Sequence, residues 1–257
     1  MFFCISCGPP PPPEALDGDT VGDSPPIASQ DGRMDTVYFL KRVSDLSSLA
    51  RSYPGESLVL RSSHTPKRAE DAGRFVKRVE ENETTWYVLA EEEGPGCITR
   101  LWLDGQVRGR LRIYFDGASA PAIESPIEAF FSGTVKPFTQ PLVYGKEATG
   151  SGTRVSYFPL PFRKACRIEL QSTTDAVKYQ VAVRKFDADA DIVTYNHPPD
   201  AQVSAAMEQL TSIYNAPAPV RYSQNAEPTK QITLKPGERN ILANLSGPAA
   251  IRYLELK

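Results

Sequence analysis

Histidine is scarce in this chain, and its scarcity argues against several kinds of catalytic site. The sequence holds only His64 and His197. A metal site of histidine and cysteine, or a Ser-His-Asp triad, would have to use one of them, and neither lies in a recognisable motif. Gly-x-Ser-x-Gly, His-Glu-x-x-His and glycine-rich phosphate-binding motifs are also missing. The sequence therefore predicts no metal site and no cofactor, and both histidines are interpreted as surface or packing residues.

Paired cysteine motifs, long apolar runs and an excess of positive charge are missing as well. Cys4-x-x-Cys7 has no second pair to complete a zinc site, and Cys97 and Cys166 lie in strand-like runs, where a small buried thiol is the common state. No apolar run approaches the ~20 residues of a membrane-spanning helix. The formal net charge of −2 gives no basic field for nucleic acid. We therefore expect neither a transmembrane span nor a nucleic-acid partner.

Proline dominates the first part of the chain, where a folded domain would need apolar residues. Residues 1–33 contain five consecutive prolines at positions 9–13, followed by a stretch rich in Gly, Asp, Ser and Pro, and are predicted to be disordered. Within them, Ile5-Ser6-Cys7 resembles the end of a bacterial lipoprotein signal, with Cys7 as the lipidated residue. This implies a secreted or lipid-anchored place in the cell envelope. The alternative is a disordered tail with two exposed thiols on a cytoplasmic protein.

The strongest internal pattern is a duplicated turn between apolar runs. Residues 93–103 read Glu-Gly-Pro-Gly-Cys-Ile-Thr-Arg-Leu-Trp-Leu, a tight turn whose glycines permit positive φ, followed by a run typical of a central strand covered on both faces. Residues 88–103 align without a gap on residues 241–256. The identical pairs are Leu89/Leu242, Ala90/Ala243, Gly94/Gly247, Pro95/Pro248, Ile98/Ile251, Leu101/Leu254 and Leu103/Leu256. The repeat predicts one complete β unit and the first strand of a second, truncated unit.

Short strands separated by turn signals predict an all-β fold, a sandwich of the jelly-roll type. Residues 111–115 alternate polar and apolar side chains and stop at Asp116-Gly117, a strong hairpin signal. A later strand places Cys166, Ile168 and Leu170 on one face, and the next places Tyr179, Val181 and Val183 on one face. The side chains of Trp102, Phe115 and Ile168 are expected in the core.

Two helices are predicted outside the strands. Residues 37–50 are expected to hold a short helix capped by Ser44 or Asp45. Asp200 is expected to cap a second helix, which runs to Tyr214 and has the apolar stripe Val203, Met207, Leu210 and Tyr214. The charged residues 51–86 are interpreted as a long solvated loop. The predicted domains are a disordered segment (1–33), a first jelly roll (34–198), and a connecting helix with the start of a truncated second jelly roll (199–257).

Carboxylates beside aromatic residues are the candidates for sugar chemistry, because glycosidases need two carboxylates flanking the scissile bond. Glu128 stands near Phe130 and Phe131, and Asp116 stands near Tyr114. The alternative, which we favour, makes the phenylalanines core residues and Asp116 a turn residue. Residues 187–191, Asp-Ala-Asp-Ala-Asp, look like the start of a calcium loop, but Ile192 and Pro198 stand where the loop requires Gly and Glu, so a solvated acidic turn is favoured.

Four motifs, in this order, resemble glycoside hydrolase family 172. They are residues 93–102 (Glu-Gly-Pro-Gly-Cys-Ile-Thr-Arg-Leu-Trp), 111–117 (Leu-Arg-Ile-Tyr-Phe-Asp-Gly), 126–131 (Pro-Ile-Glu-Ala-Phe-Phe) and 156–163 (Ser-Tyr-Phe-Pro-Leu-Pro-Phe-Arg). Residues 61–64, Arg-Ser-Ser-His, resemble a Ser-Ser loop that precedes them in the family. The resemblance covers about residues 45–257. It implies two jelly rolls per subunit, assembly into homo-oligomers such as trimers or hexamers, and hydrolysis or transfer of fructofuranosyl or arabinofuranosyl groups.

The sequence departs from the family at its catalytic residues. The family's catalytic glutamates lie in the second jelly roll, the first of them in a Gly-Thr-Glu-Asp-Tyr-Phe-like motif, and no such motif occurs here. We therefore assign no catalytic residue. The candidate substrate-binding residues are Tyr157, Phe158, Phe130 and Glu128. The expected function is that of the N-terminal part of a family 172-like enzyme, inactive as this fragment; the alternative is a non-catalytic jelly roll that binds carbohydrate or assembles subunits.

Overall fold

A computed structural model describes residues 33–45, 53–64, 74–105, 107–145, 152–172, 177–215 and 232–241. The chain divides into two compact units, one of residues 26–216 and one of residues 1–25 together with 217–257. The described part of the second unit is an exposed turn at residues 232–241, where the Glu238 carboxylate accepts a 2.8 Å hydrogen bond from the Lys235 amide. The candidate lipidation site Cys7 and residues 242–257 of the repeat lie outside the described residues. Among those described, no helix is both long and apolar enough to cross a membrane.

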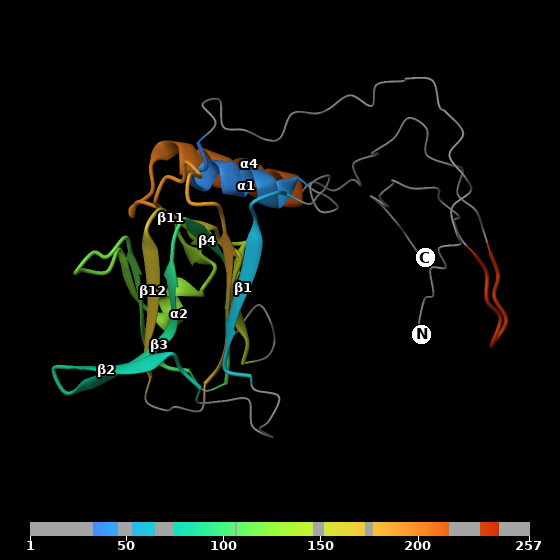
Figure 1. Ribbon diagram of the computed structural model, residues 1–257. Helices are drawn as coiled ribbons and strands as arrows, with labels where there is room; N and C mark the ends of the chain where they lie inside the picture. Colours follow the sequence, from blue (N-terminus) through green and yellow to red (C-terminus); the bar gives the residue numbers. More distant parts are fainter. Residues whose placement is uncertain are drawn as a thin grey trace. The chain divides into compact units, whose positions relative to one another are not determined.

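Two antiparallel sheets form the first unit, which confirms the predicted all-β sandwich (Figure 1). The six-stranded sheet has the order β1-β13-β4-β10-β9, with β11 also paired to β4. Its strands are β1 (Ser57–Ser62), β4 (Gly96–Asp104), β9 (Val143–Tyr144), β10 (Arg154–Ser156), β11 (Leu160–Phe162) and β13 (Lys178–Lys185). The five-stranded sheet has the order β2-β3-β12-β5-β6. Its strands are β2 (Lys77–Glu81), β3 (Thr84–Glu93), β5 (Gly109–Phe115), β6 (Ile123–Pro126) and β12 (Ala165–Ser172).

The remaining elements lie between and beside the sheets. A short hairpin pairs β7 (Thr134–Val135) with β8 (Phe138–Thr139), and α2 (Ile127–Phe130) follows β6 directly. Helices α1 (Thr36–Ser44) and α4 (Ala201–Tyr214) pack side by side across one end of the sandwich (Figure 1). They cover the edge of a core that the two sheets alone would leave open.

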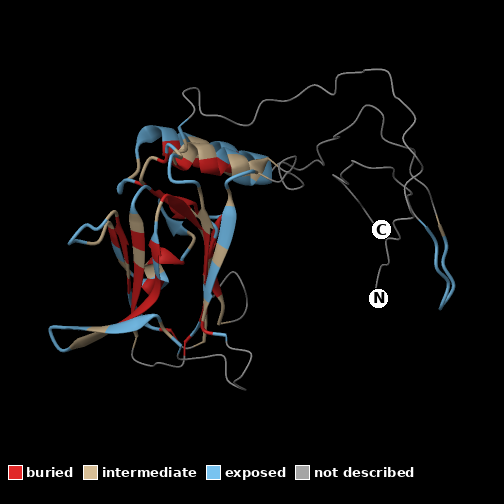
Figure 2. Cartoon of the chain, in the orientation of Figure 1, coloured by how far each residue is buried: buried red, intermediate tan, exposed pale blue. Residues whose placement is uncertain are grey.

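The core lies between the two sheets, as the buried residues in Figure 2 show. Strand β4, in the middle of the six-stranded sheet, turns Leu101 and Leu103 inward, where they are fully or almost fully buried. Phe115 and Ile168 are buried as predicted. The expectation for Trp102 was wrong, because this side chain is only half-buried. The two-residue period of a strand sends Trp102 to the face opposite its buried neighbours.

The Gly94-Pro95-Gly96 turn carries the chain from β3 in one sheet to β4 in the other. Its glycines were expected to supply positive φ, and this is wrong, since neither has it. They are needed for close approach. A Cβ on Gly94 would lie 2.5 Å from the Arg163 carbonyl oxygen, and one on Gly96 would lie 2.5 Å from Cζ of Phe162. The turn is therefore pressed against the start of β12, and the Gly94 amide donates a 2.6 Å hydrogen bond to the Lys164 carbonyl.

The first copy of the repeat shows which property the two copies share. The identical apolar positions point into the core, and none is more than 3% exposed: Leu89, Ala90, Ile98, Leu101 and Leu103. The other two identical positions, Gly94 and Pro95, make the turn between the sheets. In the first copy, the positions that are identical between the two copies are therefore core residues or turn residues.

The N-terminal helix lies earlier in the chain than predicted. Asp35 is its N-cap, since its Oδ1 accepts a 2.8 Å hydrogen bond from the Tyr38 amide. Ser44 is the last helical residue and Asp45 is the C-cap. Ser44 therefore does not begin a helix, and residues 46–50, where the predicted helix would end, lie outside the described residues. Asp and Ser are capping residue types, but Asp35 occupies the position from which a side chain reaches the first free amides.

Strands occupy much of the region interpreted as a solvated loop. Residues 57–62 form β1, residues 77–81 form β2, and β3 begins at Thr84. Asn82 and Glu83 have φ of 49° and 63°, so they form the tight turn of a hairpin. Both β1 and β2 lie at sheet edges. Charged side chains replace the apolar alternation of a buried strand in β2, whereas β1 carries the exposed Leu58 and Leu60. Residues 65–73 lie outside the described part of the chain.

The helix predicted from Asp200 is present. The Asp200 Oδ1 accepts a 3.0 Å hydrogen bond from the Val203 amide, and the helix runs to Tyr214. Val203, Met207 and Leu210 are buried in the core of the first unit, whereas Tyr214 is 66% exposed. The apolar stripe therefore ends one turn earlier than predicted.

Candidate functional site

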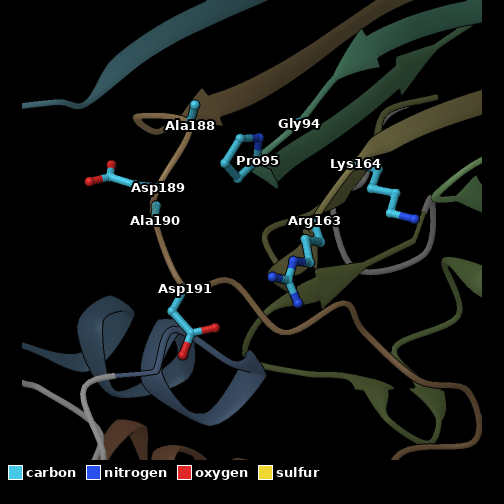
Figure 3. Close-up of a pocket in the computed structure, with 8 residues that line it drawn as sticks. All are labelled: Gly94, Pro95, Arg163, Lys164, Ala188, Asp189, Ala190 and Asp191. Carbon is cyan, nitrogen blue, oxygen red and sulfur yellow. The ribbon is translucent and has the colours of Figure 1, made fainter.

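An open cleft lies where three chain segments meet at one end of the sandwich (Figure 3). Its volume is about 590 Å³, and its walls are the β3–β4 turn, the β11–β12 turn and residues 188–191. Figure 3 shows the Arg163 guanidinium directed toward residues 188–191, with the Pro95 ring beside it, whereas Lys164 and Asp189 point away. The Arg163 guanidinium, which lies beside the Pro95 ring and the backbone of residues 188–191, can donate hydrogen bonds to the oxygen atoms of a small polar ligand.

Asp116 holds the Arg163-Lys164 turn in place. Its Oδ1 accepts hydrogen bonds from the Lys164 amide (2.6 Å) and the Ala165 amide (3.2 Å), and its Oδ2 accepts one from the Thr194 hydroxyl (2.5 Å). Burial alone would raise the pKa of Asp116, but these donors outweigh it and lower the pKa below its ordinary value. The φ values of 55° at Asp116 and 78° at Gly117 confirm the predicted turn. Asp116 is therefore an ionised turn residue and cannot serve as a general acid.

Asp116→Asn should remove the charge while keeping the acceptor oxygen and a side chain that tolerates positive φ. Because the folded pKa of Asp116 is lowered, its charge stabilises the fold above the unfolded pKa, and this contribution is lost as pH falls through the folded pKa. Hydrogen bonds to a charged acceptor are stronger than neutral ones, so we expect a loss of about 1 kcal/mol at pH 7 that fades under acid conditions. Urea unfolding at both pH values measures it. Asp189→Asn, at an exposed position beside the same cleft, is the matched control, and an equal effect of the two variants would contradict this role.

Glu128 is exposed and bound to a buried arginine. Its Oε1 accepts a 2.6 Å hydrogen bond from Nη2 of Arg154, with which it forms an ion pair. The Glu128 side chain is 65% exposed, whereas that of Arg154 is only 5% exposed. Arg154 also donates to the Gly152 carbonyl at 3.0 Å, while its buried Nε has no partner. Sequence reasoning missed Arg154, because nothing in the local sequence Thr153-Arg154-Val155 marks this arginine as buried. The pair fixes Glu128 beside a cation, not beside the second carboxylate that a glycosidase requires.

Two of the predicted binding residues lie in the core. Phe130 and Phe158 are each 1% exposed. Phe130 packs against Phe131 and Phe138, with ring centroids 4.9 and 4.4 Å apart, and Phe158 packs edge-on against Phe138 at 5.2 Å. Neither ring offers a face to a ligand in this fold, which agrees with the core alternative for Phe130. The neighbouring residue Tyr157 points the other way and is 42% exposed.

Tyr157 belongs to a group of three tyrosines from distant parts of the chain. Tyr144 ends β9, Tyr157 follows β10, and Tyr214 ends α4. Burial, a hydrogen bond with the Tyr214 side chain and the proximity of Tyr157 raise the pKa of Tyr144 to about 12, so its hydroxyl is neutral at physiological pH. Sequence reasoning found Tyr157 alone, because nothing local in the chain joins residues 144 and 214.

The histidine, cysteine and aspartate candidates have structural roles. The His197 Nδ1 lies 3.0 Å from the Tyr195 hydroxyl, its ring stacks on Phe138, and burial lowers its pKa. Cys97 and Cys166 are free buried thiols, as predicted, and burial raises the pKa of Cys166 to about 12. In the acidic run, Asp191 pairs with Arg33 at 3.8 Å. Within the described residues, no group of three His, Cys, Asp or Glu side chains is placed to hold a metal ion.

Comparison with protein families finds one match to the described sandwich. Residues 43–203 match the model of the GH172 first beta-sandwich domain. The matched range includes both sheets, the cleft, the Glu128–Arg154 pair, Tyr144 and Tyr157. No curated protein sequence matches the chain.

Proposed function

Because the chain belongs to glycoside hydrolase family 172, whose first β-sandwich domain it contains, we propose that it takes part in the hydrolysis or transfer of fructofuranosyl or arabinofuranosyl groups. In this proposal the sandwich binds the glycan and supports the site, and it does not supply the catalytic carboxylate pair. One observation supports this division of roles: the candidate acidic side chains of the sandwich are held by hydrogen-bond donors or by cations.

A glycosidase needs two carboxyl groups on either side of the bond, one of them kept protonated by its surroundings. The acidic residues nearest to aromatic side chains do not meet this need. Asp116 is bound by three donors and its pKa is lowered, and Glu128 is paired with Arg154. Glu56, between Arg42 and Arg184, also has a lowered pKa, because its ion-paired hydrogen bonds outweigh the effect of burial.

In the part of the chain that the structure describes, the two buried carboxylates, Glu92 and Glu169, are also held by cations. Glu92 pairs with Arg61 at 2.5 Å, joining the edge strand β1 to β3 in the opposite sheet, and Glu169 pairs with Arg167 at 2.9 Å. In both pairs the carboxylate is buried while the arginine is 47% or 35% exposed, so removing the arginine would leave a buried charge without its partner. Such pairs suit a scaffold better than a site in which a carboxylate must exchange a proton during each turnover.

One observation favours the alternative, a non-catalytic module that assembles subunits. Leu58 and Leu60 are 65% and 54% exposed on β1, an edge strand of the six-stranded sheet. An apolar edge strand is a surface on which another chain can pair. Homo-oligomerisation is compatible with both functions and therefore cannot distinguish them. Participation in glycoside hydrolysis can distinguish them.

Adding a glutamate-bearing second domain to the chain tests the proposed function. We expect residues 1–257, fused to the second β-sandwich domain of a family 172 enzyme, to hydrolyse aryl fructofuranosides or arabinofuranosides. The rate should exceed that of either part alone by at least about a hundredfold, because the sandwich would hold the glycan in place for carboxylates that the second domain supplies, and a misplaced substrate reacts about that much more slowly. Aryl glucopyranosides and galactopyranosides are the matched controls. Hydrolysis of the pyranosides only, or none by a folded fusion, would contradict the proposed substrate class.

A further inference from the structure

One row of side chains crosses the outer face of the six-stranded sheet. The strand registers pair Ser62 with Gln180, Gln180 with Trp102, Trp102 with Val155, and Val155 with Tyr144. Side chains that are direct cross-strand neighbours share a face of the sheet. We call this row the aromatic strip; it consists of Ser62, Gln180, Trp102, Val155 and Tyr144, from β1, β13, β4, β10 and β9.

The aromatic strip faces away from the core. The residues that alternate with it along the same strands, Leu101, Leu103, Val181 and Val143, are buried between the sheets. Every member of the strip is half-buried, so each keeps part of its surface accessible. Across five strands spaced roughly 4.8 Å apart, the strip is about 19 Å long, and Trp102 and Tyr144, two strands apart, stand about 10 Å from each other.

Two more tyrosines extend the strip at its β9 end. Tyr214 hydrogen-bonds to Tyr144, and Tyr157 lies close enough to affect its titration. Both are well exposed, at 66% and 42%. The β9 end of the strip therefore gathers three tyrosines, and Trp102 lies on the same face two strands away, beyond Val155.

The chemistry of the strip is neutral and amphipathic. Its side chains supply aromatic and aliphatic surface together with hydroxyl, amide and indole N–H groups, and none of them is an acid or base that is charged at neutral pH. The charged neighbours on the same face are of both signs: Arg100 and Asp104 flank Trp102 along β4, and Lys178 pairs with Asp104 across β13, so the face offers no field of one sign to a polyanion or a basic peptide. An uncharged sugar chain offers C–H surface to the rings and hydroxyl groups to the polar atoms, and it matches the strip in both respects.

We propose that the aromatic strip, with Tyr157 and Tyr214, binds a neutral furanose oligosaccharide along the outer face of the six-stranded sheet. The choice of furanose rests on the proposed function, whereas the choice of a neutral oligosaccharide rests on the strip itself. Its length suits several sugar units, so the strip would hold the glycan chain of a polymeric substrate and not a single terminal sugar.

Binding without catalysis tests the strip. Isothermal titration of residues 1–257 with inulin-type fructo-oligosaccharide and with arabino-oligosaccharide should show saturable binding to one of them. Tyr157→Ala and Tyr214→Ala, at exposed positions where folding should be unaffected, should each weaken it by about tenfold, as removal of an anchoring aromatic side chain does. Tyr157→Phe keeps the ring and should weaken it less. Leu58→Ala, exposed on the same sheet away from the strip, should leave it unchanged.

The outcomes separate the strip from the proposed function. The proposed binding role of the strip is contradicted if no oligosaccharide binds. It is also contradicted if binding is unchanged in Tyr157→Ala, Tyr214→Ala and Trp102→Ala. Neither result affects the proposed hydrolytic role. Binding of cello- or malto-oligosaccharides alone, lost in the same variants, supports a carbohydrate site but contradicts the furanoside class. Concentration-dependent self-association in sedimentation velocity, abolished by Tyr157→Ala, overturns the proposal in favour of a contact between copies of the chain.

Discussion

Phe115→Ala is expected to lower the free energy of unfolding by about 3–5 kcal/mol, the usual cost of truncating a buried phenylalanine. Phe115 ends β5 and is 4% exposed. Its ring meets Tyr195 edge-on, with centroids 6.2 Å apart, and Tyr195 in turn meets Phe158 at 5.9 Å. Alanine would leave a cavity in this chain of rings and would remove an aromatic contact beyond the loss of buried area.

Thermal and urea unfolding measure this loss. For a domain of this size the melting temperature should fall by roughly 6–20 °C. Phe115→Leu, which keeps most of the apolar volume, should lose less, and Val135→Ala, at a position 47% exposed, should change stability by no more than about 0.5 kcal/mol. A loss below about 1 kcal/mol for Phe115→Ala would show that the end of β5 does not lie in the core.

The parts of the fold that sequence reasoning found are those with local signals. Strand β4 follows a Gly-Pro-Gly turn and has the apolar density of a central strand. Helix α4 combines a capping aspartate with buried residues at positions 203, 207 and 210. In both cases the propensity, the cap or turn, and the apolar period agree with the tertiary environment, which is the condition under which local reasoning succeeds.

The errors arose where a tertiary contact, and not a local signal, decides the structure. Gly94 and Gly96 are required because Arg163 and Phe162 approach them, and those residues lie almost 70 positions away. Strand β2 was hidden because this edge strand carries charged side chains, such as Lys77, which reaches Glu91 on the neighbouring strand at 2.6 Å. Trp102 looked like a core residue by type, and only its position in the strand sends it outward.

The candidate site shows the same difference between features set by local sequence and features set by tertiary contacts. Tyr157 and Phe158 are adjacent and both aromatic, so composition cannot tell which is exposed; the backbone direction after β10 decides it. Arg154 and the group of Tyr144, Tyr157 and Tyr214 are assembled by sheet register and by the packing of α4. Such sites become visible only when the strand order is known.

In the proposed division of roles, residues 1–257 would bind a glycan without supplying a catalytic carboxylate pair. Removing members of such a pair costs a glycosidase many orders of magnitude in rate. Here the glutamate motif of the family does not occur in the sequence. The most exposed of the predicted residues, Glu128, is tied to Arg154, so it contributes at most a wall of a binding site.

Hydrolysis of 4-nitrophenyl arabinofuranoside and of a fructofuranoside by purified residues 1–257 tests this claim most directly. Glu128→Gln, which keeps the shape of the side chain, serves as the matched variant, and a folded state verified by circular dichroism serves as the control for both proteins. We predict no release of product above the buffer rate for either protein. Robust turnover by the unmodified chain, abolished in Glu128→Gln, would contradict the account and place a catalytic carboxylate in the first β-sandwich.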